Sequence, residues 1–240
     1  MTRSIPSDLV HVLAETRCVL LDFDGPICPI FANGRNEQIA DEMRAMLRRH
    51  EVDMPQEINN AYDPLRILRY AYEVRRADVM ADVEDTLRAA EVRAARDAIP
   101  TPDADDTLLA CHETGRPVAI VSNNSAPAVE AYLDTHRLSH LVLAVVGRKA
   151  VRPDLMKPHP DSVHRALAIL DTPAADCVLV GDSLTEIEVA HTTGVRSIGY
   201  IKTPSRRASL LAAVPDAATQ SMATLAAAIR AGQPAGRISS

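Results

Sequence analysis

The chain has 240 residues and a formal net charge of −6, and 47% of its residues are hydrophobic. The negative charge argues against an electrostatic grip on nucleic acid or on an anionic membrane surface. The charge favours instead an enzyme that acts on a small molecule. The length suits one α/β domain with a large insertion, or two small domains.

The amino terminus and the cysteines predict a cytoplasmic protein. Residues 1–8 have no unbroken apolar run of the kind that a secretory signal needs, and no later run is long enough to span a membrane. Cys18, Cys28, Cys111 and Cys177 form neither a CxxC pair nor a metal-site spacing, so we expect them to pack as small hydrophobic side chains. The sequence carries no signal for the oligomeric state.

Five short apolar segments predict parallel strands, and helical periodicity lies between most of them. The predicted strands are 19–23, 118–121, 141–146, 177–180 and 197–201. The predicted helices are 103–114, 126–137, 160–170, 185–193 and 220–231, and we expect residues 232–240 to fray. This alternation predicts an α/β fold with a doubly wound parallel sheet.

Residues 29–100 differ from the rest because they contain no convincing strand. Helical periodicity runs through 37–49, 64–76 and 83–98, and the segment is too long for an ordinary strand-to-helix connection. An insertion after the first strand covers the carboxyl edge of the sheet, where a lid would lie. We therefore predict a core of residues 1–28 and 101–240 with a helical cap domain of residues 29–100, the alternative being a helical decoration without a role in chemistry.

The first predicted strand ends in two carboxylates, Asp22 and Asp24. Ligands of open α/β sheets bind outside the carboxyl ends of the strands, so these acids lie where a site is expected. Two acids at one strand end need a compensating charge, for which a hard divalent cation is the best candidate. The alternative is that Asp22 caps a turn and that Asp24-Gly25 is ordinary turn chemistry.

The second and third predicted strands add a hydroxyl, an amide and an ammonium group to the same edge. Ser122 and Asn123 lead into a helix whose N–H groups suit an anion, although both residue types are also common N-caps. Lys157, one of three lysines in the chain, lies in a loop stiffened by Pro158 and Pro160. A rigidly held ammonium group is a natural partner for phosphate, and a solvated lysine beside two prolines is the alternative.

The fourth predicted strand is followed by Asp182, Ser183 and Glu186. Asp182 is a third carboxylate at a strand end. Ser183 and Glu186 have the spacing of a capping box, which accounts for Glu186 without catalysis. Because complementary groups follow four strands in turn, we predict that they form one active site.

These motifs resemble those of the haloacid dehalogenase-like (HAD) hydrolase superfamily. Its four motifs match Asp22-Phe23-Asp24-Gly25, Ser122-Asn123, Lys157-Pro158 and Gly181-Asp182-Ser183 with Glu186, in the order and spacing of the family. The resemblance covers residues 19 to about 201. It implies a Rossmann-like core, a helical type-1 cap in the insertion, and a magnesium-dependent phosphatase.

The resemblance also implies roles for the residues that meet the substrate. Asp22 would be the nucleophile that attacks phosphorus and becomes an aspartyl-phosphate. Asp24 would protonate the leaving oxygen and then activate water. Ser122, Asn123 and Lys157 would bind the phosphoryl group.

The remaining roles concern the cofactor, Mg²⁺. The resemblance implies that Asp182 ligates the ion together with the Asp22 side chain and the Asp24 carbonyl oxygen. Glu186, with Ser183, would support Lys157 or the waters of the metal.

Within the superfamily, the second acid of the pair argues against a dehalogenase. The absence of lysine between residues 29 and 100 argues against the phosphonatases, which use a cap lysine. A phosphosugar mutase and a non-catalytic protein that binds a phosphorylated ligand remain alternatives. We expect the partner to be a small phosphorylated metabolite. An arginine of the insertion could recognise a second anionic group, and the candidate recognition residues are Arg35, Tyr62, Arg66, Arg69, Tyr70 and Tyr72.

Overall fold

Six parallel strands form one sheet in the structure of the chain, a computed structural model that describes residues 5–32 and 34–232. The strands are β1 (Cys18–Leu21), β2 (Val118–Val121), β3 (Ala144–Val146), β4 (Cys177–Gly181), β5 (Arg196–Tyr200) and β6 (Ala217–Thr219). Their order in the sheet is β3-β2-β1-β4-β5-β6, and every neighbouring pair is parallel. The prediction of a doubly wound α/β fold is confirmed.

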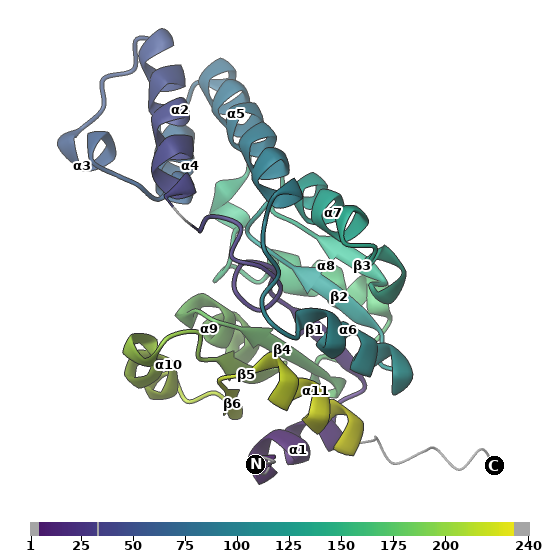
Figure 1. Cartoon of the computed structure of the whole chain (residues 1–240). Coiled ribbons are helices and arrows are strands. Elements are labelled where there is room, and N and C mark those ends of the chain that lie inside the picture. Colours follow the sequence, from purple (N-terminus) through teal and green to yellow (C-terminus); the bar gives the residue numbers. More distant parts are fainter. Residues whose placement is uncertain (1–4, 33, 233–240) are drawn as a thin grey trace.

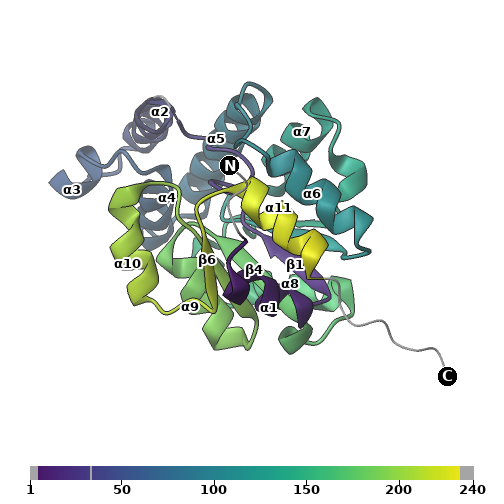
Figure 2. The same cartoon turned by 60° about the horizontal axis from the view of Figure 1, so that its bottom comes forward.

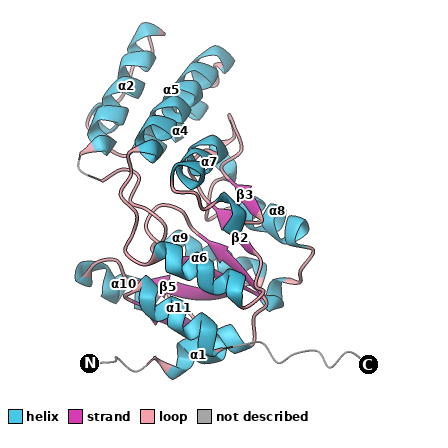
Figure 3. Ribbon diagram, turned by 45° about the vertical axis from the view of Figure 1, so that its right-hand side comes forward, coloured by secondary structure: helices cyan, strands magenta, loops and turns pink. Residues whose placement is uncertain are grey.

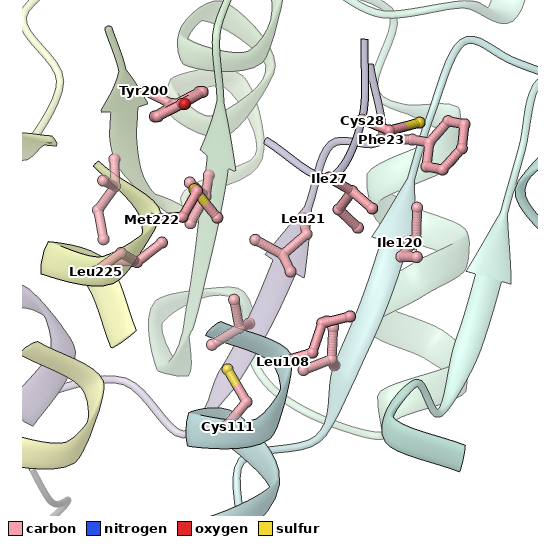
Figure 4. Packing of buried hydrophobic residues seen from close by; sticks show 14 of the residues in the cluster. Leu21, Phe23, Ile27, Cys28, Leu108, Cys111, Ile120, Tyr200, Met222 and Leu225 are labelled. Atoms are coloured by element: carbon pink, nitrogen blue, oxygen red, sulfur yellow. The ribbon is translucent and has the colours of Figure 1, made fainter. Parts of the chain in front are cut away.

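Helices cover both faces of the sheet, because successive side chains of a strand point to opposite faces and both faces are apolar (Figure 1). On one face, Val19 and Leu21 pack with α1 (Ser7–Ala14), α6 (Ala104–Glu113), α7 (Ala126–Thr135) and α11 (Met222–Ala231). On the other, Cys18 and Leu20 pack with α8 (Asp161–Leu170) and α9 (Leu184–Thr193). Figure 2 shows α1 beside α11, and Figure 4 shows Leu21 between the strands and the helices of the first face.

Short elements complete the chain. They are the 3₁₀ helices η1 (Ser139–Leu141), η2 (Pro153–Leu155), η3 (Ala174–Asp176) and η4 (Pro204–Arg206), and the helix α10 (Arg207–Ala212). Leu210 of α10 packs against Ile187 and Ile201, so α10 covers the end of the sheet beside β5. The predicted helix 220–231 corresponds to α11, and residues 233–240, predicted to fray, lie outside the described residues.

The third strand is shorter than predicted. The prediction was 141–146, but Leu141 ends η1 and β3 begins at Ala144. The N–H of Leu143 still donates to the carbonyl oxygen of Val118, the first residue of β2. Residues before Leu143 therefore have no neighbouring strand to pair with, and an apolar sequence alone does not make a strand.

The insertion consists of α2 (Arg35–Arg49), α3 (Gln56–Asn59), α4 (Pro64–Glu73) and α5 (Ala77–Arg96). Figure 3 shows α2, α4 and α5 together at one end of the molecule, away from most of the strands. They enclose an apolar cluster of their own, which includes Met43, Ile67 and Leu87. Met156, which precedes Lys157 in the core, also packs into this cluster. The insertion therefore touches the loop that carries one of the predicted site residues.

The four cysteines are free and buried, as expected of small hydrophobic side chains. Cys18 and Cys177 lie opposite each other on β1 and β4. In the part of the chain that the structure describes, no helix combines the length and the hydropathy that a membrane crossing requires.

Candidate active site

The carboxyl ends of β1 and β4 meet at the point where the strand order reverses. The chain runs outward from β1 to β3 on one side and from β4 to β6 on the other, which leaves a crevice between β1 and β4. Asp22 follows β1, and Asp182 and Glu186 follow β4. One side-chain oxygen of each of the three lies within 4.8 Å of those of the other two. Three acids predicted from two separate motifs are thus brought together.

Lys157 is the positive charge at the centre of this group. Its Nζ lies 2.7 Å from Asp22 Oδ1 and 2.9 Å from Glu186 Oε1, and it also donates to the carbonyl oxygen of Val121 at 2.9 Å. The side chain of Lys157 is 1% exposed. Burial disfavours the charged form, but Asp22 and Glu186 outweigh it and raise the pKa of Lys157, so the ammonium group stays protonated.

Burial strongly affects the pKa values of the carboxyl groups in the site. Burial, reinforced by Glu186 and Asp182 and opposed by Lys157, raises the pKa of Asp22 to about 7. Burial and the neighbouring carboxylates likewise raise the pKa of Asp24 and of Asp182 to about 6 each. Burial also acts on Glu186, but Lys157 and hydrogen bonds from Ser183 and Thr185 outweigh it and lower its pKa. Glu186 and Lys157 therefore form an ion pair beside three aspartates that need a further cation.

The donor atoms fit a magnesium ion. Mg²⁺ prefers hard oxygen ligands, and Asp22 and Asp182 offer carboxylate oxygens on adjacent strand ends. Glu186 belongs to the same group of acids, but its two oxygens are engaged with Lys157 and with the N–H and hydroxyl of Ser183. A Cβ atom on Gly25, whose φ is +125°, would lie 2.5 Å from the Asp182 side chain, so a glycine is needed for this approach.

Ser183 and Glu186 form the predicted capping box at the start of α9. The Ser183 N–H donates to Glu186 Oε2 at 3.0 Å, and the Ser183 hydroxyl donates to the same oxygen. The capping interpretation and the site interpretation of Glu186 are therefore compatible, because one carboxylate caps the helix with Oε2 and binds Lys157 with Oε1.

The loop after β2 contributes a hydroxyl and a brace for Lys157. Ser122 is buried and lines the same cavity as Asp22, with its hydroxyl bonded to Asn124. Both polar atoms of the Asn123 side-chain amide form hydrogen bonds with the Lys157 backbone. Its Oδ1 accepts from the Lys157 N–H at 2.8 Å, and its Nδ2 donates to the Lys157 carbonyl oxygen at 3.3 Å. Asn123 therefore positions Lys157. Because it also lines the cavity, its role as a phosphate ligand stays a prediction.

A buried ion-pair network joins the insertion to this loop. Arg148, after β3, lies 2.6 Å from Glu84 and 2.5 Å from Glu91, both on α5. Glu91 also accepts hydrogen bonds from the Asn124 side chain at 3.3 Å and from the Ser125 N–H at 3.0 Å. The side chains of Arg148 and Glu91 are completely buried. The sequence pattern did not reveal these residues, because Glu84 and Glu91 look like ordinary polar positions of a helix.

A cavity of about 720 Å³ opens over the acids. Asp24, Asp182 and Ser183 line it together with Asp22, Ser122, Asn123, Lys157 and Glu186, so all eight predicted site residues border one space. Of the six candidate recognition residues of the insertion, only Arg69 lines this cavity. Arg66 instead pairs with Glu57, and the Tyr70 hydroxyl donates to Asp53.

Two further cations line the cavity from the core, Lys202 after β5 and Arg206 in η4. Lys202 Nζ lies 3.9 Å from Asp182 Oδ2. A signal for Lys202 was present in the sequence, since it is one of three lysines and directly follows a predicted strand. Arg206 had none, because it lies several residues beyond the strand end.

The comparisons with known proteins agree with this geometry. The family model described as haloacid dehalogenase-like hydrolase matches residues 19–200. The phosphoglycolate phosphatase of Aliivibrio fischeri is 32% identical over 96 residues, which is 40% of this chain and 41% of that protein. The phosphoglycolate phosphatase of Escherichia coli is 30% identical over 98 residues, or 41% of this chain and 38% of that protein. The matched part is therefore about two fifths of each curated relative.

Solved structures share the fold over nearly the whole chain. CbbY from Rhodobacter sphaeroides in complex with phosphate has a TM-score of 0.64 and 19% identity, and the match covers 87% of this chain and 95% of that one. A predicted phosphatase from Clostridium acetobutylicum has a TM-score of 0.66 and 17% identity, with 89% and 98% covered. Because the family model spans most of the sheet and all four motifs, the chain belongs to the haloacid dehalogenase-like hydrolase family.

The buried network makes a prediction about stability. Arg148→Met leaves two carboxylates buried without a cation, and we expect a loss of about 3–5 kcal/mol in the free energy of unfolding, measured with urea. Arg93→Met on α5, the helix that carries Glu84 and Glu91, removes an exposed pair with Glu42 and should cost less than about 1 kcal/mol. Combining Arg148→Met with Glu84→Gln and Glu91→Gln should recover most of the loss, whereas an additive further loss would contradict the network.

The raised pKa values predict how the stability of the fold depends on pH without bound metal. Asp22, Asp24 and Asp182 have folded-state pKa values above the usual 3.8, so between about pH 4 and 7 the folded chain binds more protons than the unfolded chain. These groups therefore lower stability as pH rises through this window. The lowered pKa of Glu186 acts in the opposite direction, but below about pH 4.5.

Because Mg²⁺ offsets the repulsion of ionised carboxylates, saturating Mg²⁺ should raise the melting temperature by roughly 5 °C or more at pH 7.5 and by less at pH 5. Thermal unfolding of the wild type and of Asp182→Asn measures this. The variant should lose most of the magnesium effect. An equal shift at both pH values, or a full shift in Asp182→Asn, would contradict the assignment.

Proposed function

We propose that the chain is a magnesium-dependent phosphatase that hydrolyses a small phosphorylated metabolite through an aspartyl-phosphate on Asp22. The observation that supports this most strongly is the contact of Lys157 with Asp22 and Glu186 at 2.7 and 2.9 Å, beside Asp182 and under one cavity. A buried cation beside a buried carboxylate can draw a phosphoryl group towards a nucleophile that would otherwise repel it.

The first step transfers the phosphoryl group to the protein. An oxygen of the Asp22 carboxylate attacks phosphorus, and the bond from phosphorus to the leaving oxygen breaks. Asp24, which lines the same cavity, gives its proton to that oxygen, so the organic product leaves as an alcohol. A pKa of about 6 suits this task, because near neutral pH the group can both donate and accept a proton.

The second step restores Asp22. The Asp24 carboxylate takes a proton from water, the water oxygen attacks phosphorus, and the bond between phosphorus and Asp22 breaks to release inorganic phosphate. Lys157 and the Ser122 hydroxyl hold the phosphoryl oxygens in both steps. The N–H groups of Phe23 and Asp24 donate to no other described residue, so they too are available to the phosphoryl group. Asp22 and Asp182, with the Asp24 carbonyl oxygen, would hold Mg²⁺, which when bound would neutralise charge between carboxylate and phosphate.

We propose that residues 29–100 form the cap domain on a core of residues 1–28 and 101–240. The separate apolar cluster of α2, α4 and α5 supports this division. The cavity supports it as well, because Asn36, Asp63 and Arg69 of the insertion line it opposite the acids of the core. A cap in this position excludes water from the first step and contacts the part of the substrate that does not react.

The relatives support a small substrate. Two curated relatives are named for the hydrolysis of phosphoglycolate, and a related CbbY structure from Rhodobacter sphaeroides holds xylulose-(1,5)-bisphosphate. The cavity of this chain lies in the volume range of small-molecule sites. We therefore propose a phosphorylated metabolite of low molecular mass as the substrate.

A panel of phosphate esters, assayed for phosphate release with and without Mg²⁺, tests the proposal. We expect metal-dependent turnover by the wild type, none above background by Asp22→Asn, and a decrease of about 10²–10⁴-fold in kcat for Asp24→Asn. Asp85→Asn, which changes an exposed acid of α5, is the matched control and should retain full activity. Turnover that survives in Asp22→Asn would refute the proposed nucleophile.

Product analysis separates the phosphatase from the two alternatives. A phosphosugar mutase would return an isomerised phosphate in place of free phosphate. A non-catalytic protein would bind phosphorylated ligands without turning over any member of the panel.

A further inference from the structure

Three cations line the cavity in addition to Lys157. Arg69 comes from α4 of the insertion, Lys202 follows β5, and Arg206 lies in η4. The insertion and the core thus each contribute positive charge to one space. Lys157 is already committed to Asp22 and Glu186, so these three cations are an additional feature.

The two arginines have no side-chain partner among residues 5–32 and 34–232. Among the residues that the structure describes, neither Arg69 nor Arg206 makes an ion pair or a side-chain hydrogen bond. Arg66, one turn earlier on α4, does pair with Glu57 at 3.0 Å. Asp63, the one acid of the insertion that borders the cavity, accepts a hydrogen bond from the Leu65 N–H and caps α4. The positive charge of Arg69 is therefore available to a ligand.

The acids of the core do not need these arginines. Glu186 is paired with Lys157, which also contacts Asp22, and Asp22 and Asp182 are the proposed magnesium ligands. Lys202 lies 3.9 Å from Asp182, at the long limit of an ion pair. The phosphoryl group has its own partners in Lys157, Ser122 and the N–H groups after β1. The guanidinium groups thus lie in the cavity without a role in the transfer itself.

We propose that Arg69 and Arg206, with Lys202 beside them, bind a second anionic group of the substrate, a carboxylate or a second phosphate. This rests on the proposed phosphatase function and narrows its substrate class to phosphate esters with two separate anionic groups. Guanidinium groups bind both kinds of anion through paired hydrogen bonds. Because one arginine belongs to the insertion and the other to the core, such a substrate would connect the two across the cavity, whereas a simple phosphate monoester would not.

Matched substrates test the proposal. Alkyl phosphates are compared with ω-carboxyalkyl phosphates and with alkane-α,ω-bisphosphates of equal chain length, all with Mg²⁺. We expect kcat/KM of the wild type to be at least about tenfold higher for one of the two series with a second anionic group than for the alkyl phosphates. The series with the larger gain identifies the second group as carboxylate or phosphate. The gain should decrease with ionic strength, because the arginines are exposed to solvent.

The chain offers a neighbouring control for each arginine. Arg69→Ala and Arg206→Ala should each reduce the preference for the second anion by threefold or more, and the double variant should bring the ratio close to one. Arg66→Ala and Arg207→Ala remove the same charge from residues that do not line the cavity, and they should leave the ratio unchanged. Lys202 is left intact, because its proximity to Asp182 would mix this effect with metal binding.

The outcomes separate this proposal from the phosphatase proposal on which it rests. If the wild type hydrolyses all series equally, or if the four variants behave alike, the second-anion site is wrong and the phosphatase remains. If no ester is hydrolysed, the phosphatase proposal is wrong, and calorimetric titration with the same compounds tests the second-anion site. Binding that is tighter for the compounds with a second anionic group and weakened by Arg69→Ala supports the site. Equal binding of all the compounds refutes the site.

Discussion

The contact of one buried ammonium group with two carboxylates organises the site. Lys157 lies within 3 Å of Asp22 and Glu186, and it is the only cation that contacts them among the described residues. Without it, two acids would be buried beside Asp182 with no compensating charge, and an uncompensated buried charge costs about 3–5 kcal/mol. The position of Lys157 is in turn fixed by Asn123, which bonds both its N–H and its carbonyl oxygen. Groups from the loops after β1, β2, β3 and β4 therefore depend on one another.

A second constraint concerns the insertion. The end of α5 is not free of the core, because Ala94 and Ala95 pack into the core cluster and Glu91 is bonded to Arg148 and to the loop after β2. Moving α5 away from this loop would separate buried charges. A closing motion of the insertion therefore has to leave the carboxyl-terminal half of α5 in place. The same network gives the loop that carries Ser122 a fixed backbone, which a phosphate site requires.

The sequence was sufficient for the existence of β1 to β5 and for the motifs, because both have local signals. Runs such as 177–180 are continuous and apolar, and the acids follow them directly. It was insufficient for β6, whose three residues Ala217–Thr219 have no strand-like composition, and for α1, whose N-cap Pro6 offers no capping side chain.

The contacts between elements could not be predicted for a different reason. Arg148 and Glu91 lie 57 positions apart, and only the packing of α5 against the loops after β2 and β3 brings them together. Asn123 was assigned to the phosphate because its place in the motif is visible in the sequence, whereas its hydrogen bonds to Lys157 are not. Motif position indicates that a residue belongs to a site, and geometry is needed to decide which atom it touches.

The most direct test of the account is to detect phosphate on Asp22. The protein is mixed with Mg²⁺ and a turned-over ester, quenched in acid within milliseconds, digested, and analysed by mass spectrometry. We predict a phosphoryl group on the peptide that contains Asp22 and none in Asp22→Asn. With an ester whose leaving group needs no protonation, Asp24→Asn should hold more of it than the wild type, because only the second step is then slowed. Turnover by the wild type with no phosphoryl group on this peptide in either the wild type or Asp24→Asn would contradict the account.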